Sequence, residues 1–110
     1  MGNSFSSLKK ERDIQAVFLE RTRLSNKNFI FYYKFNLDKG IRVVFFVPKK
    51  VFKRAWDRNR TRRILREVFR NYSWDNRGLD IICIVRTLES KMLSLKEIEP
   101  LCQPLLRDIV

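Results

Sequence analysis

Arg58-Asn59-Arg60-Thr61-Arg62-Arg63-Ile64-Leu65-Arg66-Glu67-Val68-Phe69-Arg70 decides the fold, because this stretch combines a helical period with a dense, one-sided positive charge. One arc of its helical wheel is mainly apolar and holds Thr61, Ile64, Leu65, Val68 and Phe69. The adjoining arc holds Arg58, Asn59, Arg62, Arg63, Arg66 and Arg70, with Arg60 and Glu67 at its far edge. The pattern predicts an amphipathic helix that packs on a sheet and turns a row of guanidinium groups outward.

A run of charges is most often a solvated helix face, but such a face usually mixes acids with bases. Here only Glu67 is spaced to pair with Arg63 or Arg70, so the other arginines repel one another. Guanidinium groups are planar forks that match phosphate oxygens in bidentate geometry. The stretch therefore favours a polyphosphate partner over a purely solvated face.

The charge of the whole chain supports a nucleic-acid partner. The 110 residues are the length of one domain, and the net charge is +12. Ten bases and two acids lie between Lys49 and Arg70, so the charge is concentrated in one segment. No apolar run approaches a membrane span and no signal-peptide pattern is present, so we expect no membrane partner and a cytoplasmic location.

Histidine and cysteine usage argues against an active site within the protein. The chain has no histidine, which removes imidazole acid–base chemistry and most zinc sites. Cys83 lies in an apolar run and Cys102 in a predicted helix, so both are expected to be buried thiols in a reducing compartment. The acids are scattered, and no metal site is predicted in the protein.

Periodicity predicts helices and strands around one core, with 8–110 as a single domain behind a flexible tail over 1–7. The expected elements are a helix to residue 20 or 21, a very short strand at 22–24, strands at 28–35 and 41–47, the arginine-rich helix to residue 72, a strand at 79–85 and a last helix from 95. The fold class is thus α/β (α+β), two-layered, with a central mixed sheet and a strand–helix–strand crossover through the arginine-rich helix.

Five local expectations follow from short stretches. Ser7 is expected to cap the first helix, and Ser94 and Glu97 are expected to form a capping box at the start of the last one. Residues 36–40 should form a hairpin loop, and residues 41–47 should be buried on both faces. Pro100 and Pro104 should kink or delay the last helix.

The pattern Arg58-Asn59-Arg60-x-Arg62-Arg63-x-x-Arg66-Glu67 resembles the signature of the protein subunit of bacterial ribonuclease P. The order of the other elements agrees, including Val47-Pro48-Lys49-Lys50 ahead of the helix and a closing helix introduced by Leu93-Ser94. The resemblance covers roughly Leu8 to Leu106. It departs from the family at the 52–57 loop, which is slightly longer here.

The resemblance implies a subunit without catalytic residues, in which a large RNA holds Mg²⁺ and removes the 5′ leader of precursor tRNA. It implies a left-handed crossover, no obligatory protein partner, and two surfaces. The surface for the catalytic RNA would comprise Lys50, Lys53, Arg54, Arg58, Asn59, Arg60, Arg62, Arg63 and Arg66. The leader cleft would comprise Ile14, Phe18 and Tyr32, where Ile14 replaces a commonly aromatic position.

Alternatives remain open on the residues alone. Phe18 and Tyr32 fit core packing as well as a cleft. A basic RNA-binding protein of ribosomal type, with no role in tRNA processing, would explain the charge and the aromatics but not the spacing of the arginines. An autonomous nuclease is disfavoured because histidine is absent and the acids are dispersed.

Overall fold

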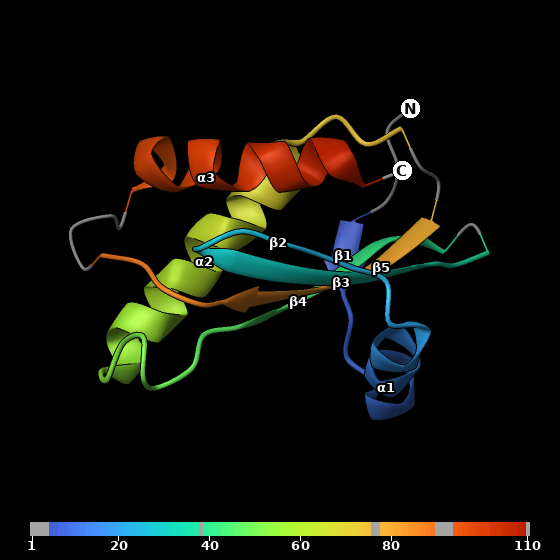
Figure 1. The fold of residues 1–110 in the computed structure, drawn as a ribbon, viewed down its shortest axis with the longest axis horizontal. Helices are drawn as coiled ribbons and strands as arrows, with labels where there is room; N and C mark the ends of the chain where they lie inside the picture. The colour runs from blue at the N-terminus through green and yellow to red at the C-terminus, as the bar shows by residue number, and fades with distance from the viewer. Residues whose placement is uncertain (1–4, 38, 76–77, 90–93, 110) are drawn as a thin grey trace.

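The computed structural model describes residues 5–37, 39–75, 78–89 and 94–109. Figure 1 shows one sheet with helices on both of its faces. The elements are β1 (Phe5–Ser7), α1 (Glu11–Glu20), β2 (Arg23–Ser25), β3 (Phe29–Phe35), β4 (Gly40–Phe46), α2 (Ala55–Asn71), β5 (Gly78–Val85) and α3 (Leu95–Asp108). The mixed α and β class predicted from the sequence is confirmed.

The five strands form one mixed sheet in the order β1-β4-β5-β3-β2. β5 is the central strand, parallel to β4 and antiparallel to β3. Seven of its eight residues are buried, as its nearly continuous apolar sequence predicts for a strand covered on both faces. The predicted crossover is confirmed, because α2 connects the parallel neighbours β4 and β5.

The prediction that residues 41–47 are buried on both faces was wrong. Burial alternates along β4, where Val43 and Phe45 are buried and Phe46 is 41% exposed. The reason is that β4 lies beside β5 rather than at the centre, and the helix over its second face does not cover all of it.

The two faces of the sheet are covered unequally. The main core lies on the face that packs against α2 and α3, and in it the Phe69 ring meets the rings of Phe31 and Phe45. Among the described residues, the other face is covered by α1, whose Val17 packs with Leu8 and with Ile82 of β5. The helix α1 therefore adds a partial third layer to the two expected from the sequence, as Figure 1 shows.

The N-terminal segment differs from the predicted tail. Residues 5–7 form β1, which pairs in parallel with β4, while residues 1–4 lie outside the described residues. Ser7 belongs to this strand and does not cap α1; the helix begins at Glu11, with Lys10 as its N-cap and no side-chain cap bond. The prediction was wrong because pairing with a distant strand overrode the local capping signal.

The hairpin predicted at residues 36–40 is also absent, because β5 lies between β3 and β4. Asn36 instead joins the three strands: its amide donates to the Gly40 carbonyl at 3.1 Å and to Asp80 Oδ1 at 2.7 Å. A Cβ at Gly78 would lie 1.9 Å from Asn36 Oδ1, so this approach requires glycine. Asp38 lies outside the described residues.

The last helix tolerates both of its prolines. α3 starts at Leu95, so it is not delayed, and Pro100 and Pro104 lie on its exposed side. There, water can bind the carbonyls that lose their N–H partners. The predicted capping box is not formed as such, since the Ser94 hydroxyl donates to the Glu97 carboxylate at 2.9 Å and makes no side-chain bond to the backbone.

Both cysteines are buried and free, as predicted. Burial raises the pKa of Cys83 well above its ordinary value, and raises the pKa of Cys102 from 9.0 to about 12. Both thiols are therefore neutral and inert in the folded protein.

Candidate nucleic-acid interface

The arginines of α2 are oriented by the opposite side of the same helix. Leu65, Val68 and Phe69 are fully buried against the sheet and α3, and Ile64 is partly buried. Thr61 is buried too, and its hydroxyl donates back to the Asp57 carbonyl at 2.8 Å. The predicted apolar arc of α2 therefore packs in the core, and the basic arc faces solvent.

The structure brings three of the predicted arginines together with Asn59 around one hollow. This hollow has a volume of about 550 Å³ and is lined by Trp56, Asn59, Arg62, Arg63 and Arg66. Arg62 donates to the side-chain oxygen of Asn59, one turn earlier. Three guanidinium groups around one hollow make a site suited to phosphate oxygens.

Arg66 is held at the inner edge of this hollow. Its guanidinium donates to the Ser7 hydroxyl at 2.9 Å and lies 5.7 Å from the centre of the Phe45 ring. The strand β1 thus fixes one arginine of the hollow. These contacts cross elements far apart in sequence, so spacing alone could not predict them.

Arg58 lies apart from the hollow. Its guanidinium donates to the carbonyls of Phe52 and Lys53 at 2.9 and 2.8 Å, so it fastens the segment between β4 and α2 to the first turn of α2. The expectation that Arg58 forms one outward row with Arg62 and Arg66 is therefore corrected: the guanidinium of Arg58 points to backbone carbonyls.

Three other predicted bases do not line the hollow. Lys50, Lys53 and Arg54 are exposed on the segment that leads into α2. The segment predicted as a divergent loop over 52–57 is partly helical, because α2 begins at Ala55.

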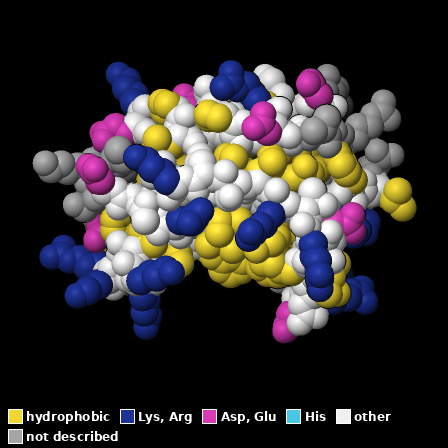
Figure 2. All heavy atoms as spheres, viewed as in Figure 1, with side chains coloured by type: hydrophobic (Ala, Val, Ile, Leu, Met, Phe, Trp, Pro, Cys, Tyr) yellow, Lys and Arg dark blue, Asp and Glu magenta, His cyan; other side chains and the backbone are white. Residues whose placement is uncertain are grey.

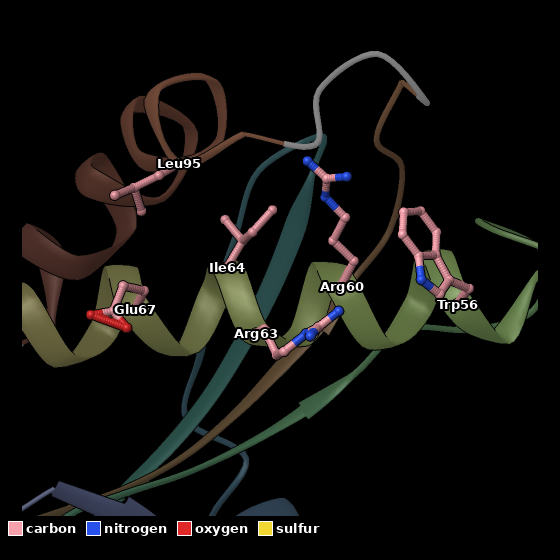
Figure 3. A pocket seen from close by; sticks show the side chains of 6 residues that line it. All are labelled: Trp56, Arg60, Arg63, Ile64, Glu67 and Leu95. Atoms are coloured by element: carbon pink, nitrogen blue, oxygen red, sulfur yellow. The ribbon is translucent and has the colours of Figure 1, made fainter.

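Arg60 belongs to a second, more apolar groove between α2 and α3. Figure 3 shows the side chains that line it, and its volume is about 400 Å³. The lining residues are Trp56, Arg60, Arg63, Ile64, Glu67 and Leu95. The guanidinium carbon of Arg60 lies 5.6 Å from the centre of the Trp56 ring.

The face of the sheet that carries α1 provides a different kind of surface. Strand register places side chains of β3, β5 and β4 in rows across this face: Tyr32, Ile82 and Val44 in one row and Ile30, Ile84 and Phe46 in the next. The first row packs under α1, whereas Ile30 and Ile84 are only partly buried and Phe46 is exposed. Figure 2 shows hydrophobic side chains gathered on this side of the molecule, bordered by lysines and arginines.

The three residues predicted for a cleft lie together beside these rows. The Phe18 and Tyr32 rings meet edge to face with centres 4.9 Å apart, and Phe18 is 39% exposed. Ile14 packs partly buried at the same cluster. Arg23 approaches the Tyr32 hydroxyl at 3.5 Å, which places a positive charge next to the aromatic pair. The structure thus leaves Phe18 half-open rather than in the core.

An ion pair joins the strands β4 and β5 beneath α1. Arg42 on β4 binds Asp80 on β5 through Nε and Nη2, at 2.7 and 2.6 Å, and lies 3.6 Å from Asp13 on α1. The hydrogen bond to Asp80 is the main cause that raises the pKa of Arg42. The network ties α1 to the two strands beneath it.

Sequence reasoning missed Trp56 and Phe46 as candidate site residues. Each is a large exposed apolar side chain in a segment that was assigned to a loop or to a buried strand. The alternation of burial along β4 follows from its place in the sheet, which no local pattern specifies.

The described residues contain no group of three or more histidine, cysteine or acidic side chains that could hold a metal ion. Within the same residues, no helix is long and apolar enough to cross a membrane.

Known proteins match both the sequence and the fold. The family model described as Ribonuclease P matches residues 3–110. The ribonuclease P protein component of Phytoplasma australiense is 36% identical over 93 residues, which cover 84% of this chain and 80% of that protein.

The ribonuclease P protein of Thermotoga maritima superposes with a TM-score of 0.79 at 28% identity, over 94% of this chain and 97% of the other. The Staphylococcus aureus protein, at 24% identity and a TM-score of 0.71 over 94% and 96% of the two chains, shows the same fold. The chain therefore belongs to the ribonuclease P family, as a protein subunit of that ribonucleoprotein endoribonuclease.

Proposed function

We propose that this protein subunit binds the catalytic RNA of ribonuclease P through the hollow lined by Asn59, Arg62, Arg63 and Arg66 on α2, called the arginine hollow below. It binds the 5′ leader of precursor tRNA beside α1. Removal of the leader gives the mature 5′ end of the tRNA. In this proposal Mg²⁺ is held by the RNA subunit and the protein supplies binding and orientation rather than chemistry.

The observation that carries the first part is the hollow itself. Asn59, Arg62, Arg63 and Arg66 line one space large enough for sugar–phosphate groups. Arg62 and Arg66 are already held in place by Asn59 and Ser7. Preformed guanidinium positions lose less conformational freedom on binding. Neutralising RNA phosphates there releases counterions, so binding should weaken steeply as salt rises.

The leader site draws support from the half-covered sheet face. A single-stranded RNA is held by stacking on aromatic rings and by nearby positive charge, with little demand on base sequence. Phe18, Tyr32 and Phe46 offer rings on that face, and Arg23 lies beside Tyr32. Ile14 supplies an apolar contact instead of a ring. The helix α1 covers one face of the sheet and α2 packs against the other, so one protein molecule could contact both RNAs at once.

The test is cleavage of precursor tRNA by a bacterial ribonuclease P RNA at low magnesium, with and without this protein. We expect the protein to restore cleavage at the mature 5′ end. Tight RNA binding without restored cleavage, across several RNA subunits, would mean that α2 is only a generic basic face. Cleavage by protein freed of all RNA would overturn the assignment of chemistry to the RNA.

A further inference from the structure

The groove between α2 and α3 exposes a tryptophan whose ring plays no part in the phosphate contacts proposed above. Trp56 is 59% exposed, and Leu95 on the facing helix is 37% exposed. Isolated exposed apolar side chains are ordinary. Here, however, Trp56, Ile64 and Leu95 line one groove together, and large aromatic rings in such grooves are typical of binding sites.

We propose that this groove accepts an unpaired nucleobase of the ribonuclease P RNA subunit, stacked on the indole ring of Trp56. The inference rests on the proposed function, since it requires that the same RNA covers α2. The stacked base would add a contact that is insensitive to salt to the phosphate contacts of the arginine hollow.

The geometry of the two sites favours this occupant. Trp56 and Arg63 line both the apolar groove and the arginine hollow, so the two spaces share a wall. A nucleotide carries its base directly beside its phosphate. An RNA strand whose phosphates lie in the hollow therefore has a base within reach of the groove, and an unpaired base has a π-face free to stack.

The Trp56 ring is held ready by Arg60. The Arg60 guanidinium lies over the ring at 5.6 Å, which restrains the ring in one orientation, while most of Trp56 stays accessible. Figure 3 shows the two side chains projecting together from neighbouring turns of α2. A restrained ring loses little freedom when a base stacks on it, which favours binding.

The charge in the groove indicates which end the nucleotide enters. Glu67 lines the end away from Trp56, about 16 Å along the helix axis by helical rise, and pairs with Arg70 at 3.1 Å. Its carboxylate repels phosphate, whereas Arg60 and Arg63 attract it. The sugar–phosphate chain is thus directed to the Trp56 end.

The position of the groove selects the RNA subunit over precursor tRNA. The leader surface lies beside α1, on the opposite face of the sheet from α2 and α3. A base in the α2–α3 groove therefore comes from the RNA that covers α2, which in the proposed function is the catalytic RNA.

The first experiment measures the affinity of the full-length protein for its own RNA subunit over a range of salt concentrations. We expect Trp56→Leu to weaken binding about 5- to 100-fold, as loss of one stacked base does, and Trp56→Tyr to restore most of it. The slope of log affinity against log salt should not change, because no phosphate contact is lost. Leu19→Ala on α1, an exposed apolar side chain away from the groove, is the matched control and should bind as the parent does.

The second experiment uses fluorescence of a Trp74→Phe variant, in which Trp56 is the only tryptophan. Titration with the RNA subunit should quench its emission in parallel with binding. Unchanged emission at saturation, or equal binding by Trp56→Leu, would overturn the inference while leaving the proposed function intact. An effect of Trp56→Leu on precursor-tRNA binding alone would overturn the choice of RNA. Failure of the parent protein to bind the RNA subunit would overturn the proposed function itself.

Discussion

Arg42 and Asp80 form a two-pronged ion pair across β4 and β5, with Nε–Oδ1 and Nη2–Oδ2 distances of 2.7 and 2.6 Å. Asp80 is 4% exposed and also accepts a hydrogen bond from Asn36, so its carboxylate links β4 and β5 to the residue that follows β3. The pair joins the central strand to the strand that begins the crossover, and Asp13 adds α1 to the same cluster.

Asp80→Ala should therefore destabilise the fold strongly. It leaves the partly buried Arg42 guanidinium and the Asn36 amide without their shared acceptor, and such losses cost about 3 kcal/mol or more. Chemical unfolding would measure the change, with exposed Asp75→Ala as the control. A double variant with Arg42→Met and Asp80→Leu should recover part of the loss. A single-variant effect equal to that of the control would contradict the structural role.

Arg58→Ala should lower stability, because Arg58 holds the carbonyls of Phe52 and Lys53. Loss of these hydrogen bonds to a charged donor should reduce the free energy of unfolding by about 1 to 2 kcal/mol. Arg58→Lys should recover little, since an ammonium group lacks the planar fork that spans both carbonyls. A variant with an unchanged melting midpoint but weaker RNA binding would instead make Arg58 a phosphate contact.

Arg62→Ala should weaken binding to the RNA subunit and leave the melting midpoint nearly unchanged. Arg62 donates to Asn59 on the same helix, so this hydrogen bond does not tie it to the core. The slope of log affinity against log salt should become shallower by about one unit, as expected for one lost phosphate contact. Arg107→Ala on α3 is the matched control.

Arg66→Ala should also weaken RNA binding, but with some loss of stability. Unlike Arg62, Arg66 touches Ser7 and the Phe45 ring, so its removal loosens the contact between β1 and α2. Thermal unfolding of the two arginine variants side by side would measure the difference. Equal midpoints would show that the β1 contact adds nothing to stability.

Phe18→Ala should reduce affinity for leader-bearing precursor tRNA more than for leaderless tRNA. The ring is half-open and meets Tyr32 edge to face, which suits a stacked base. Binding of both substrates to the assembled ribonucleoprotein would be compared, with Leu19→Ala as the control on the same helix. Equal effects on the two substrates would mean that Phe18 only packs α1.

Stability should fall as the pH rises above about 9. Burial raises the pKa of Cys102 from 9.0 to about 12 and raises that of Cys83 well above 9.0, so the unfolded chain releases these protons first. Their stabilising contribution is complete below the unfolded pKa and is lost as pH rises toward the folded one. Urea unfolding between pH 7 and 10 would measure the decline, and Cys83→Val should make it shallower. An identical pH dependence in that variant would exclude the thiols as its cause.

The helix α2 could be predicted from sequence because its apolar side and its basic side both follow the helical period within one short stretch. The same residues that pack, such as Leu65 and Val68, fix where Arg62 and Arg66 point. The resemblance to ribonuclease P proteins placed Phe18 and Tyr32 together, which periodicity alone could not do.

The order of the strands could not be predicted, because pairing partners far apart in sequence decide it. Asn36 to Gly40 has the composition of a hairpin, yet β5 inserts between the strands that it connects. Serine is a residue type that often caps helices, yet Ser7 lies in β1 and pairs with β4. In both cases a long-range contact outweighed a sound local signal.

The central position of β5 also governs when the chain can fold as it leaves the ribosome. Before residues 78–85 emerge, only the short pairings β2–β3 and β1–β4 are available, and β3 and β4 have no strand between them. The sheet therefore closes only when most of the polypeptide has been synthesised, which leaves the aromatic strand β3 and the basic helix α2 exposed together during translation.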